Sequence, residues 1–173
     1  MAGDIKLQYG TAATFTVTAL HSLASSSTNV AGWTSIGIDN ITDEAVDYLI
    51  SGTFTIDNAG AATAGKSIKV YAYAAFNDTP TWPDLFSSGT EGTEGAATVH
   101  DEEQRDCGMR LLWAGVVDAG TSEVYVMPPT SLSQVFGGIV PSDWALFVVQ
   151  DTGQALESTG SAVYRVPVSY QYT

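Results

Sequence analysis

The chain has 173 residues, of which 45% are hydrophobic and 14% are charged, and its 19 acidic and six basic residues give a formal net charge of −13 at pH 7. A single domain of this size can bury a core without disulfides or metal ions, and the one cysteine excludes an internal disulfide. The acidic balance repels phosphate backbones and anionic headgroups, so we expect no binding to nucleic acid or to a membrane surface.

The first ten residues predict a short extended arm ahead of the domain. Ile5, Leu7 and Tyr9 alternate with polar residues, so the three apolar side chains share one face. We therefore divide the chain into an N-terminal arm over residues 1–10 and a single β-sandwich domain over residues 11–173. The arm contains no apolar signal core, and we expect the protein to be made and assembled in a reducing cytoplasm.

Alternating patterns predict the strands in the first half of the domain. Tyr48–Asp57 and Lys66–Phe76 alternate apolar and polar side chains with a period of two, which is typical of strands with one buried face. The glycine-bounded segment Asn58–Gly65 between them predicts a hairpin turn. Shorter strands are expected over Thr14–Leu20 and Trp33–Ile38, with a serine-rich loop between them.

The second half of the domain begins with a long segment that has no periodic pattern, Asn77–Gly108, which we expect to be an irregular loop. Met109–Val117 and Ser122–Met127 predict a second hairpin. Ser131–Phe136 predicts one turn of helix, and Trp144–Gln150 is apolar on both faces, as expected for a central strand.

The last predicted strand is Val163–Tyr172. Pro167 cannot donate a ladder hydrogen bond, so the strand should lie at a sheet edge or carry a bulge there. One side of it collects apolar and aromatic side chains, namely Tyr164, Val166, Val168, Tyr170 and Tyr172. Together these patterns predict an all-β fold: an antiparallel two-sheet β-sandwich of jelly-roll type, with about eight strands, one long loop and at most a short helical turn.

Residue types that serve in catalysis are sparse. His21 and His100 are the only imidazole bases, and Cys107 follows Asp106, whose charge disfavours a thiolate. The acidic cluster around His100 lacks the ligand spacing of a calcium loop. We therefore expect no enzyme, no catalytic residue, no metal site and no cofactor.

Aromatic residues are better candidates for an interaction surface. Tyr71 and Tyr73 lie on the polar face of their strand, and Trp82 and Phe86 lie in the long loop. Exposed aromatic rings stack on sugars or anchor protein interfaces. The same four rings can instead cover the second face of the sandwich or hold the loop against it, and the sequence leaves both interpretations open.

Short segments spread over most of the chain carry a resemblance to a known family. They are Ile5–Gly10, Asn77–Phe86, Val135–Pro141, Asp143–Val149, Asp151–Gly153 and Leu156. Together they resemble a group of small tailed-bacteriophage virion proteins, the capsid decoration (cement) proteins of jelly-roll type. The segments are turns and core strands, so the resemblance supplies no active-site residues.

The resemblance implies a structural protein on the outside of a phage head, commonly a homotrimer, that bridges subunits of the major capsid protein and is assembled in the host bacterial cytoplasm. As its subunit or capsid interface we single out Ile5, Leu7 and Tyr9 of the arm and Trp82 and Phe86 of the loop. Two alternatives stay open: a tail-tube or baseplate subunit, and a carbohydrate-binding module for host adhesion that stacks sugars on the aromatic residues.

Overall fold

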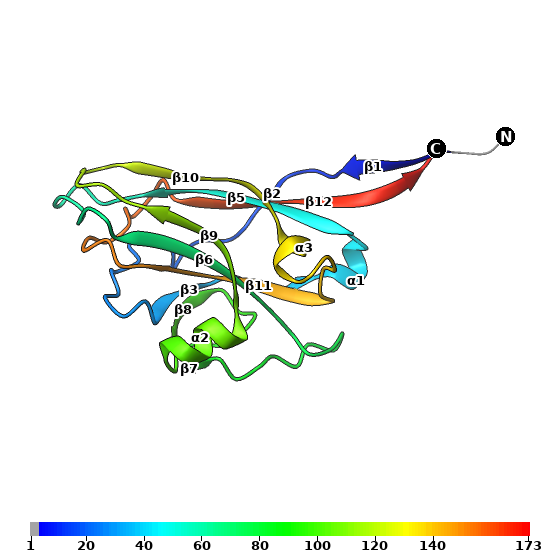
Figure 1. Ribbon diagram of the computed structural model, residues 1–173, viewed down its shortest axis with the longest axis horizontal. Coiled ribbons are helices and arrows are strands. Elements are labelled where there is room, and N and C mark those ends of the chain that lie inside the picture. Colours follow the sequence, from blue (N-terminus) through cyan, green and yellow to red (C-terminus); the bar gives the residue numbers. More distant parts are fainter. Residues whose placement is uncertain (1–3) are drawn as a thin grey trace.

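The computed structural model describes residues 4–173 and consists of two antiparallel sheets packed face to face (Figure 1). Sheet A contains, in spatial order, β1 (Ile5–Tyr9), β12 (Ala162–Tyr172), β5 (Asp47–Thr55) and β10 (Val124–Ser131), and β2 (Ala13–Thr14) also pairs with β12. Sheet B contains β7 (Phe86–Ser88), β8 (Gly95–Val99), β3 (Ala31–Thr34), β11 (Asp143–Gln150), β6 (Ser67–Ala74) and β9 (Arg110–Val116), and β4 (Ile38–Asp39) also pairs with β11. The predicted all-β sandwich is confirmed.

The strand pairs are nested in the order of a jelly roll. The first strands, β1 and β2, pair with the last strand, β12; β3 and β4 pair with β11; β5 pairs with β10; and β6 pairs with β9. The chain therefore runs as one long hairpin whose successive pairs lie alternately in sheet A and sheet B, which is how a jelly roll closes.

Both predicted hairpins are wrong for the same reason. The strands on either side of Asn58–Gly65 are β5 and β6, and they lie in opposite sheets, as β9 and β10 do. The alternation itself was correct, since Tyr48, Ile50 and Phe54 of β5 are fully buried in the core between the sheets. Alternation identifies which face of a strand is buried, but it does not identify the strand's neighbour. Two successive strands with buried faces can pair in one sheet, or they can lie in opposite sheets with those faces packed against each other.

The strand predicted over Thr14–Leu20 is also mostly wrong, because only Thr14 belongs to a strand, β2. Beyond it the chain leaves β12 and turns, with the Leu20 N–H donating to the Val17 carbonyl at 3.1 Å. Phe15 and Leu20 are nevertheless buried, so apolar positions in this segment fill the end of the core without extended pairing.

The last strand, β12, is not an edge strand, because β5 flanks it on one side and β1 and β2 on the other. The Gly10 N–H donates to the Pro167 carbonyl at 2.8 Å, so Pro167 faces the gap between β1 and β2. In a strand, the N–H and the C=O of one residue point to the same neighbouring strand. Pro167 has no N–H, but on that side the neighbouring strand is interrupted between β1 and β2, so no ladder hydrogen bond is lost there.

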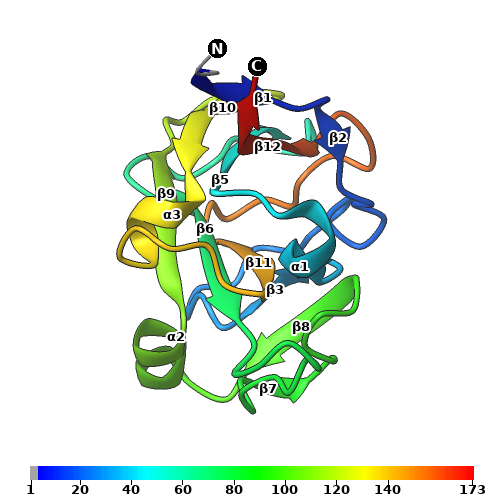
Figure 2. The same ribbon diagram turned by 90° about the vertical axis from the view of Figure 1, so that its right-hand side faces the viewer.

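The segment predicted as an irregular loop, Asn77–Gly108, is an ordered insertion between β6 and β9. It contains helix α2 (Glu102–Gly108) and the strands β7 and β8, which extend sheet B beyond β3 (Figures 1 and 2). Phe86 of β7 and Val99 of β8 pack in one cluster with Tyr73 and Phe147, on the face of sheet B that points away from sheet A. Together with α1 (Asn40–Asp43) and α3 (Leu132–Val135), helix α2 corrects the expectation of at most one helical turn. Only α3 coincides with the predicted turn at Ser131–Phe136.

Two glutamates order this insertion. Glu94 Oε1 accepts hydrogen bonds from the Ala19 N–H and from the Trp33 indole N–H, both at 2.9 Å. Glu91 Oε1 accepts from two consecutive backbone N–H groups, those of Leu85 and Phe86, at 2.8 and 2.9 Å. Their carboxylates thus serve as hydrogen-bond acceptors for groups that would otherwise lack a partner.

Candidate functional site

The insertion covers aromatic residues that the sequence offered as candidates for binding. Tyr73 is fully buried, with its ring centroid 5.4 Å from that of Trp82 and 5.7 Å from that of Phe86. Phe86 is only 7% exposed and Tyr71 only 5%. Of the two interpretations left open for these rings, the structure supports the one in which they hold the insertion against the sandwich. Phe86 is therefore a poor interface residue, and Trp82 is half-buried.

The hydroxyl of Tyr73 fastens this covering layer. It accepts a hydrogen bond from the Gly92 N–H at 3.0 Å and shares a second, at 2.6 Å, with the hydroxyl of Thr34. Burial raises the pKa of Tyr73 to about 12. The ring is therefore neutral at physiological pH and acts as a structural tether for the insertion.

The face of sheet A that points away from the core is open. Val124 and Val126 of β10 are 55% and 63% exposed, and Tyr164 of β12 is 39% exposed. Leu49 of β5 and Val166 of β12 are register partners on the same face and are half-buried. We call these five residues the outer face.

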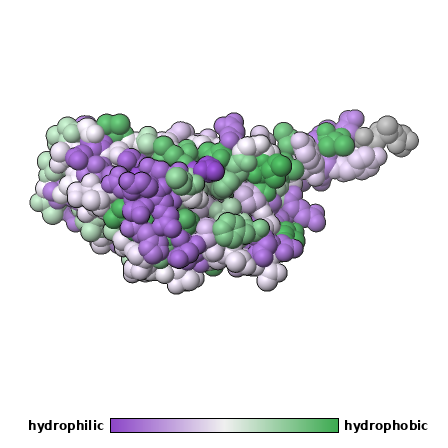
Figure 3. All heavy atoms as spheres, turned by 60° about the horizontal axis from the view of Figure 1, so that its bottom comes forward, coloured by the Kyte–Doolittle hydropathy of each residue, from purple (hydrophilic) through white to green (hydrophobic). Residues whose placement is uncertain are grey.

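Beyond the outer face, sheet A narrows to a two-stranded ribbon, formed by β1 and residues 168–172 of β12. The pairing of β12 with β5 ends at Val168 opposite Asp47, whereas its pairing with β1 continues to Tyr172 opposite Ile5. All five residues of β1 are exposed, and Figure 3 shows the ribbon extending beyond the rest of the molecule. The arm predicted over residues 1–10 is thus, over Ile5–Tyr9, a strand paired within its own chain; residues 1–3 lie outside the described part.

One side of the ribbon carries apolar and aromatic side chains, and the other side carries polar ones. Register pairs place Leu7 beside Tyr170 and Ile5 beside Tyr172. We call the resulting set, each member 54% to 71% exposed, the apolar row: Ile5, Leu7, Tyr9, Tyr170 and Tyr172. The opposite side of the ribbon carries polar residues, namely Lys6, Gln8, Ser169 and Gln171.

The outer face and the apolar row lie on the same side of β12 and are nearly free of charge. Among the outward positions of β1, β5, β10 and β12 in residues 4–173, Asp47 is the only charged residue. Its carboxylate accepts hydrogen bonds from the Ser131 hydroxyl at 2.6 Å and from the Ser133 N–H at 2.8 Å. In a chain of net charge −13, this side of the molecule is the one suited to an uncharged partner.

The acidic residues around the start of α2 do not form one site, because each of them contacts a different neighbour. Asp101 caps the helix, Asp106 accepts a hydrogen bond from the Arg105 Nε–H at 2.8 Å, and His100 lies 3.4 Å from Asp84. Within residues 4–173, no three His, Cys, Asp or Glu side chains are grouped so as to hold a metal ion. Independence of metal stays a prediction, which thermal melts with and without a chelator test.

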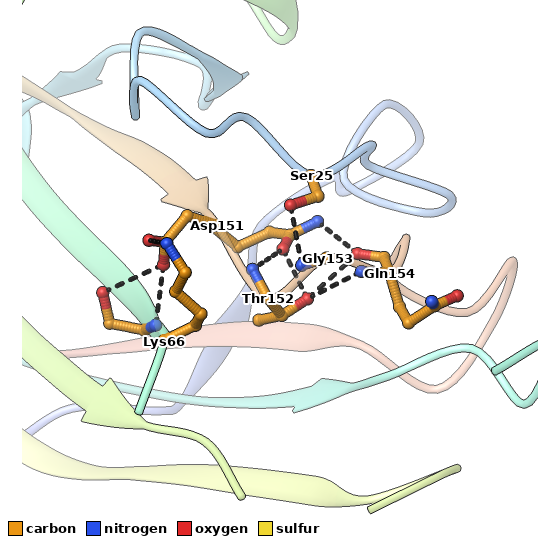
Figure 4. Close-up of polar contacts among 8 residues, drawn as sticks. Ser25, Lys66, Asp151, Thr152, Gly153 and Gln154 are labelled. Atoms are coloured by element: carbon orange, nitrogen blue, oxygen red, sulfur yellow. Dashed lines mark hydrogen bonds and ion pairs between the residues drawn. The ribbon is translucent and has the colours of Figure 1, made fainter. Parts of the chain in front are cut away.

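A buried polar network at the end of β11 has a structural role (Figure 4). Gln150 is fully buried; its Oε1 accepts from the N–H and hydroxyl of Thr152 at 2.8 and 2.7 Å, and its Nε2 donates to the carbonyls of Leu23 and Gln154 at 3.0 and 2.8 Å. The amide therefore uses its donors and acceptor within the chain and has none aimed at a ligand.

The carboxylate of the neighbouring Asp151 also has all its contacts within the chain. Burial by itself raises the pKa of Asp151, but hydrogen bonds from the Ser67 N–H and from Lys66 outweigh it and lower the pKa below the ordinary value. The Ser67 N–H lies 2.7 Å from Asp151 Oδ1, and Lys66 Nζ lies 3.3 Å from Oδ2. This group ties the start of β6 to the end of β11.

A cavity of about 480 Å³ lies between the serine-rich loop and β3 and β8. Its walls contain serine, threonine, alanine, glycine and one leucine, with no histidine, cysteine or carboxylate. The cavity therefore offers hydroxyl groups without a base to activate them.

Comparison with known proteins finds no matching family model and no matching curated protein sequence. None of the helices in residues 4–173 has the length and apolar character needed to span a membrane.

Proposed function

We propose that this protein is a structural virion protein of a bacteriophage: a capsid decoration, or cement, protein on the outside of the head. The observation that carries the proposal is the outer face, a group of exposed and half-buried apolar side chains on a sheet surface with almost no charge. Soluble domains rarely leave such a surface open unless it binds a partner. The jelly roll and the resemblance of the sequence to phage decoration proteins support the shell of a phage head as that partner.

The mechanism would be burial of apolar area across subunit boundaries. A sheet face that covers parts of two neighbouring major capsid protein subunits binds only the assembled shell, and it therefore stabilises that state by mass action. Each 100 Å² of apolar surface removed from water contributes roughly 2.5 kcal/mol before the costs of association. The acidic remainder of the surface would keep the protein away from DNA, and further copies would complete a homotrimer.

The alternatives differ in what they require of this structure. A carbohydrate-binding module that stacked sugars on the rings singled out in the sequence would need them exposed, whereas Tyr71 and Tyr73 are buried and Trp82 is half-buried, so we do not propose it. A tail-tube or baseplate subunit would use the same open face but would form rings and occupy the tail. The position of the protein in a virion reconstruction distinguishes these two.

The experiment compares two valine substitutions in binding to capsid shells that lack the protein. Val126→Glu places a charge on the outer face, and Val116→Glu places the same charge at an equally exposed valine on β9 of sheet B, where Val116 is 70% exposed. We expect Val126→Glu to reduce occupancy at least tenfold, and Val116→Glu to leave it within about twofold, because only the former desolvates a charge at the contact.

Two outcomes would overturn the proposal. If the wild-type protein does not bind shells, or if a virion reconstruction places it in the tail, it is not a decoration protein. If both glutamate variants bind as well as the wild type, the outer face is not the surface that contacts the shell.

A further inference from the structure

A smaller cavity, of about 340 Å³, lies where helix α2 meets the strands β6 and β9. Strand β6, helix α2 and the segment that leads from α2 into β9 supply its lining residues: Lys69, Tyr71, Arg105, Asp106, Met109 and Leu111. This volume lies at the lower end of the range that small-molecule sites span, roughly 300–1,000 Å³. Unlike the larger cavity beside the serine-rich loop, it has positively charged side chains in its walls.

The walls of this cavity are mostly buried side chains, so the fold holds its shape. Tyr71 is 5% exposed and Met109 is 2% exposed, whereas Leu111, the register partner of Tyr71, is 50% exposed. Arg105 is only 4% exposed, and its guanidinium carbon lies 5.3 Å from the centroid of the Tyr71 ring. The cavity thus combines an apolar wall with a positive group in a fixed position.

The nitrogen atoms of Arg105 differ in how they are used. Nε donates a hydrogen bond to Asp106 at 2.8 Å, and Nη1 donates one to the carbonyl of Asn29 at 2.6 Å. Nη2 lies 4.0 Å from Glu102 Oε2, which is too far for a hydrogen bond. The charge of Arg105 is therefore largely balanced within the chain, but Nη2 retains donor capacity for a ligand.

Lys69 supplies an unpaired charge to the cavity. Its side chain is half-buried, and within residues 4–173 its ammonium group forms no hydrogen bond and no ion pair. Lys66, three residues earlier, is by contrast paired with Asp151 at 3.3 Å. Charges that are partly removed from water are normally paired, and a chain with 19 acids and six bases offers carboxylates in excess. The missing partner of Lys69 therefore indicates a place for an external anion.

From these contacts we propose that the cavity binds a small monocarboxylate, a ligand with one carboxylate group attached to an apolar body. The carboxylate pairs with Lys69 and accepts a hydrogen bond from Arg105 Nη2, and the apolar body packs against Tyr71. One unpaired cation favours one negative charge, and the net charge of −13 opposes a dianion such as a phosphate monoester. The site lies on sheet B, away from the outer face, so the inference does not depend on attachment to a capsid.

The test titrates the full-length protein with benzoate, and with neutral benzamide as the matched control ligand, and follows the backbone amide signals by NMR at low salt. We expect saturable shifts centred on Lys69, Tyr71 and Leu111. Benzamide should bind at least tenfold more weakly, because it lacks the charge that pairs with Lys69. Raising the salt to about 0.5 M should weaken benzoate binding severalfold, because salt screens the ion pair.

Two substitutions in the walls test the assignment of the residues. Lys69→Met removes the charge but keeps a long apolar side chain, and it should weaken benzoate binding at least tenfold. The matched control is Lys6→Met, at an exposed lysine of β1, which should change binding less than twofold. Leu111→Glu places a carboxylate beside the site and should also weaken binding at least tenfold, because like charges repel. Circular dichroism and melting establish that each variant is folded.

The inference is overturned if no saturable shift appears up to about 50 mM benzoate, well above the millimolar affinity that one ion pair and a small apolar contact provide. Equal binding of benzoate and benzamide also overturns it. So does a folded Lys69→Met variant that binds benzoate as well as the wild type, or a Lys6→Met variant that loses as much binding. A protein that binds benzoate in this cavity but does not bind shells contradicts the proposed function alone.

Discussion

Sheets A and B are built from the same kind of alternating strand, and they differ in what covers their outward faces. On sheet B, Tyr73 and Phe147 point outward and are completely buried under the insertion. On sheet A, Val126 and Tyr164 point outward and are 63% and 39% exposed. Whether a sheet face is core or surface thus depends on the segment that lies over it. In this protein the insertion closes one side and leaves the other exposed.

The largest expected effect on the free energy of unfolding comes from removing a large side chain from the covered face of sheet B. Phe147→Ala removes a fully buried ring that lies 5.4 Å from Phe86, centroid to centroid, and should lower the free energy of unfolding by about 3–5 kcal/mol. Tyr164→Ala, on the open face of sheet A, should cost less than about 1 kcal/mol. Urea unfolding measures both, and equal losses would mean that the insertion does not seal sheet B.

A smaller effect is expected from the hydroxyl that tethers the insertion. Tyr73→Phe leaves the buried Thr34 hydroxyl and the Gly92 N–H without their partner, which should cost about 1–3 kcal/mol. The matched control is Tyr170→Phe, whose side chain is 65% exposed and whose loss of a hydroxyl should be nearly neutral.

The same variant tests the raised pKa of Tyr73. Because the folded pKa of about 12 lies above the ordinary 10.0, the neutral hydroxyl contributes stability that is fully present below pH 10 and is lost as the pH rises towards 12. Tyr73→Phe should reduce the alkaline loss of stability without abolishing it, because the pKa values of Tyr48, Tyr71 and Tyr125 are raised as well. Wild-type protein and variant with identical stability curves between pH 9 and 12 would contradict the assignment.

The smallest effect is expected where two carboxylates face each other at the end of sheet B. Burial, followed by the nearby charge of Asp39, raises the pKa of Asp143, and one of its oxygens is buried without a hydrogen-bond partner. A raised folded pKa means that ionisation above the ordinary 3.8 destabilises the folded state. Asp143→Asn should therefore raise the melting temperature slightly at pH 7, and the gain should shrink as the pH falls below the raised pKa.

Asp39 supplies a control for Asp143, because its pKa is shifted in the opposite direction. Hydrogen bonds from the Thr42 hydroxyl and N–H lower the pKa of Asp39, which also caps α1. Its ionised form therefore stabilises the fold above pH 3.8, and Asp39→Asn should lower the melting temperature at neutral pH. A gain in both variants, or a gain in Asp143→Asn that does not depend on pH, would contradict this interpretation.

The sequence by itself determined which residues form most strands and, for β5 and β6, which side chains face the core between the sheets. Tyr48, Ile50, Ile68 and Val70 all lie in the core between the sheets, as their alternation predicts. All residues of β11 are buried, as its apolar character on both faces requires. These properties are local: successive side chains of a strand point to opposite faces, and the hydrophobic effect sorts the two faces.

Strand pairing and the order of the insertion were decided only by the tertiary structure. β5 and β6 satisfy the same alternation whether they pair in one sheet or face each other across the core, so local pattern cannot choose between these arrangements. Residues 77–108 show no period because distant groups order them; Glu94, for example, binds Trp33, which is 61 positions away. An acidic residue with that role cannot be told apart in sequence from a solvated one.

For the candidate site, too, the sequence determined one part and the tertiary structure decided the other. Alternation in the first ten residues already placed Ile5, Leu7 and Tyr9 on one face, and alternation in the last strand placed Tyr170 and Tyr172 together. That the two groups form a single apolar row, continuous with an open sheet face, follows only from the register that sets Leu7 opposite Tyr170. The physical reason is that chain ends separated by the whole length of the protein become neighbours only when the jelly roll closes.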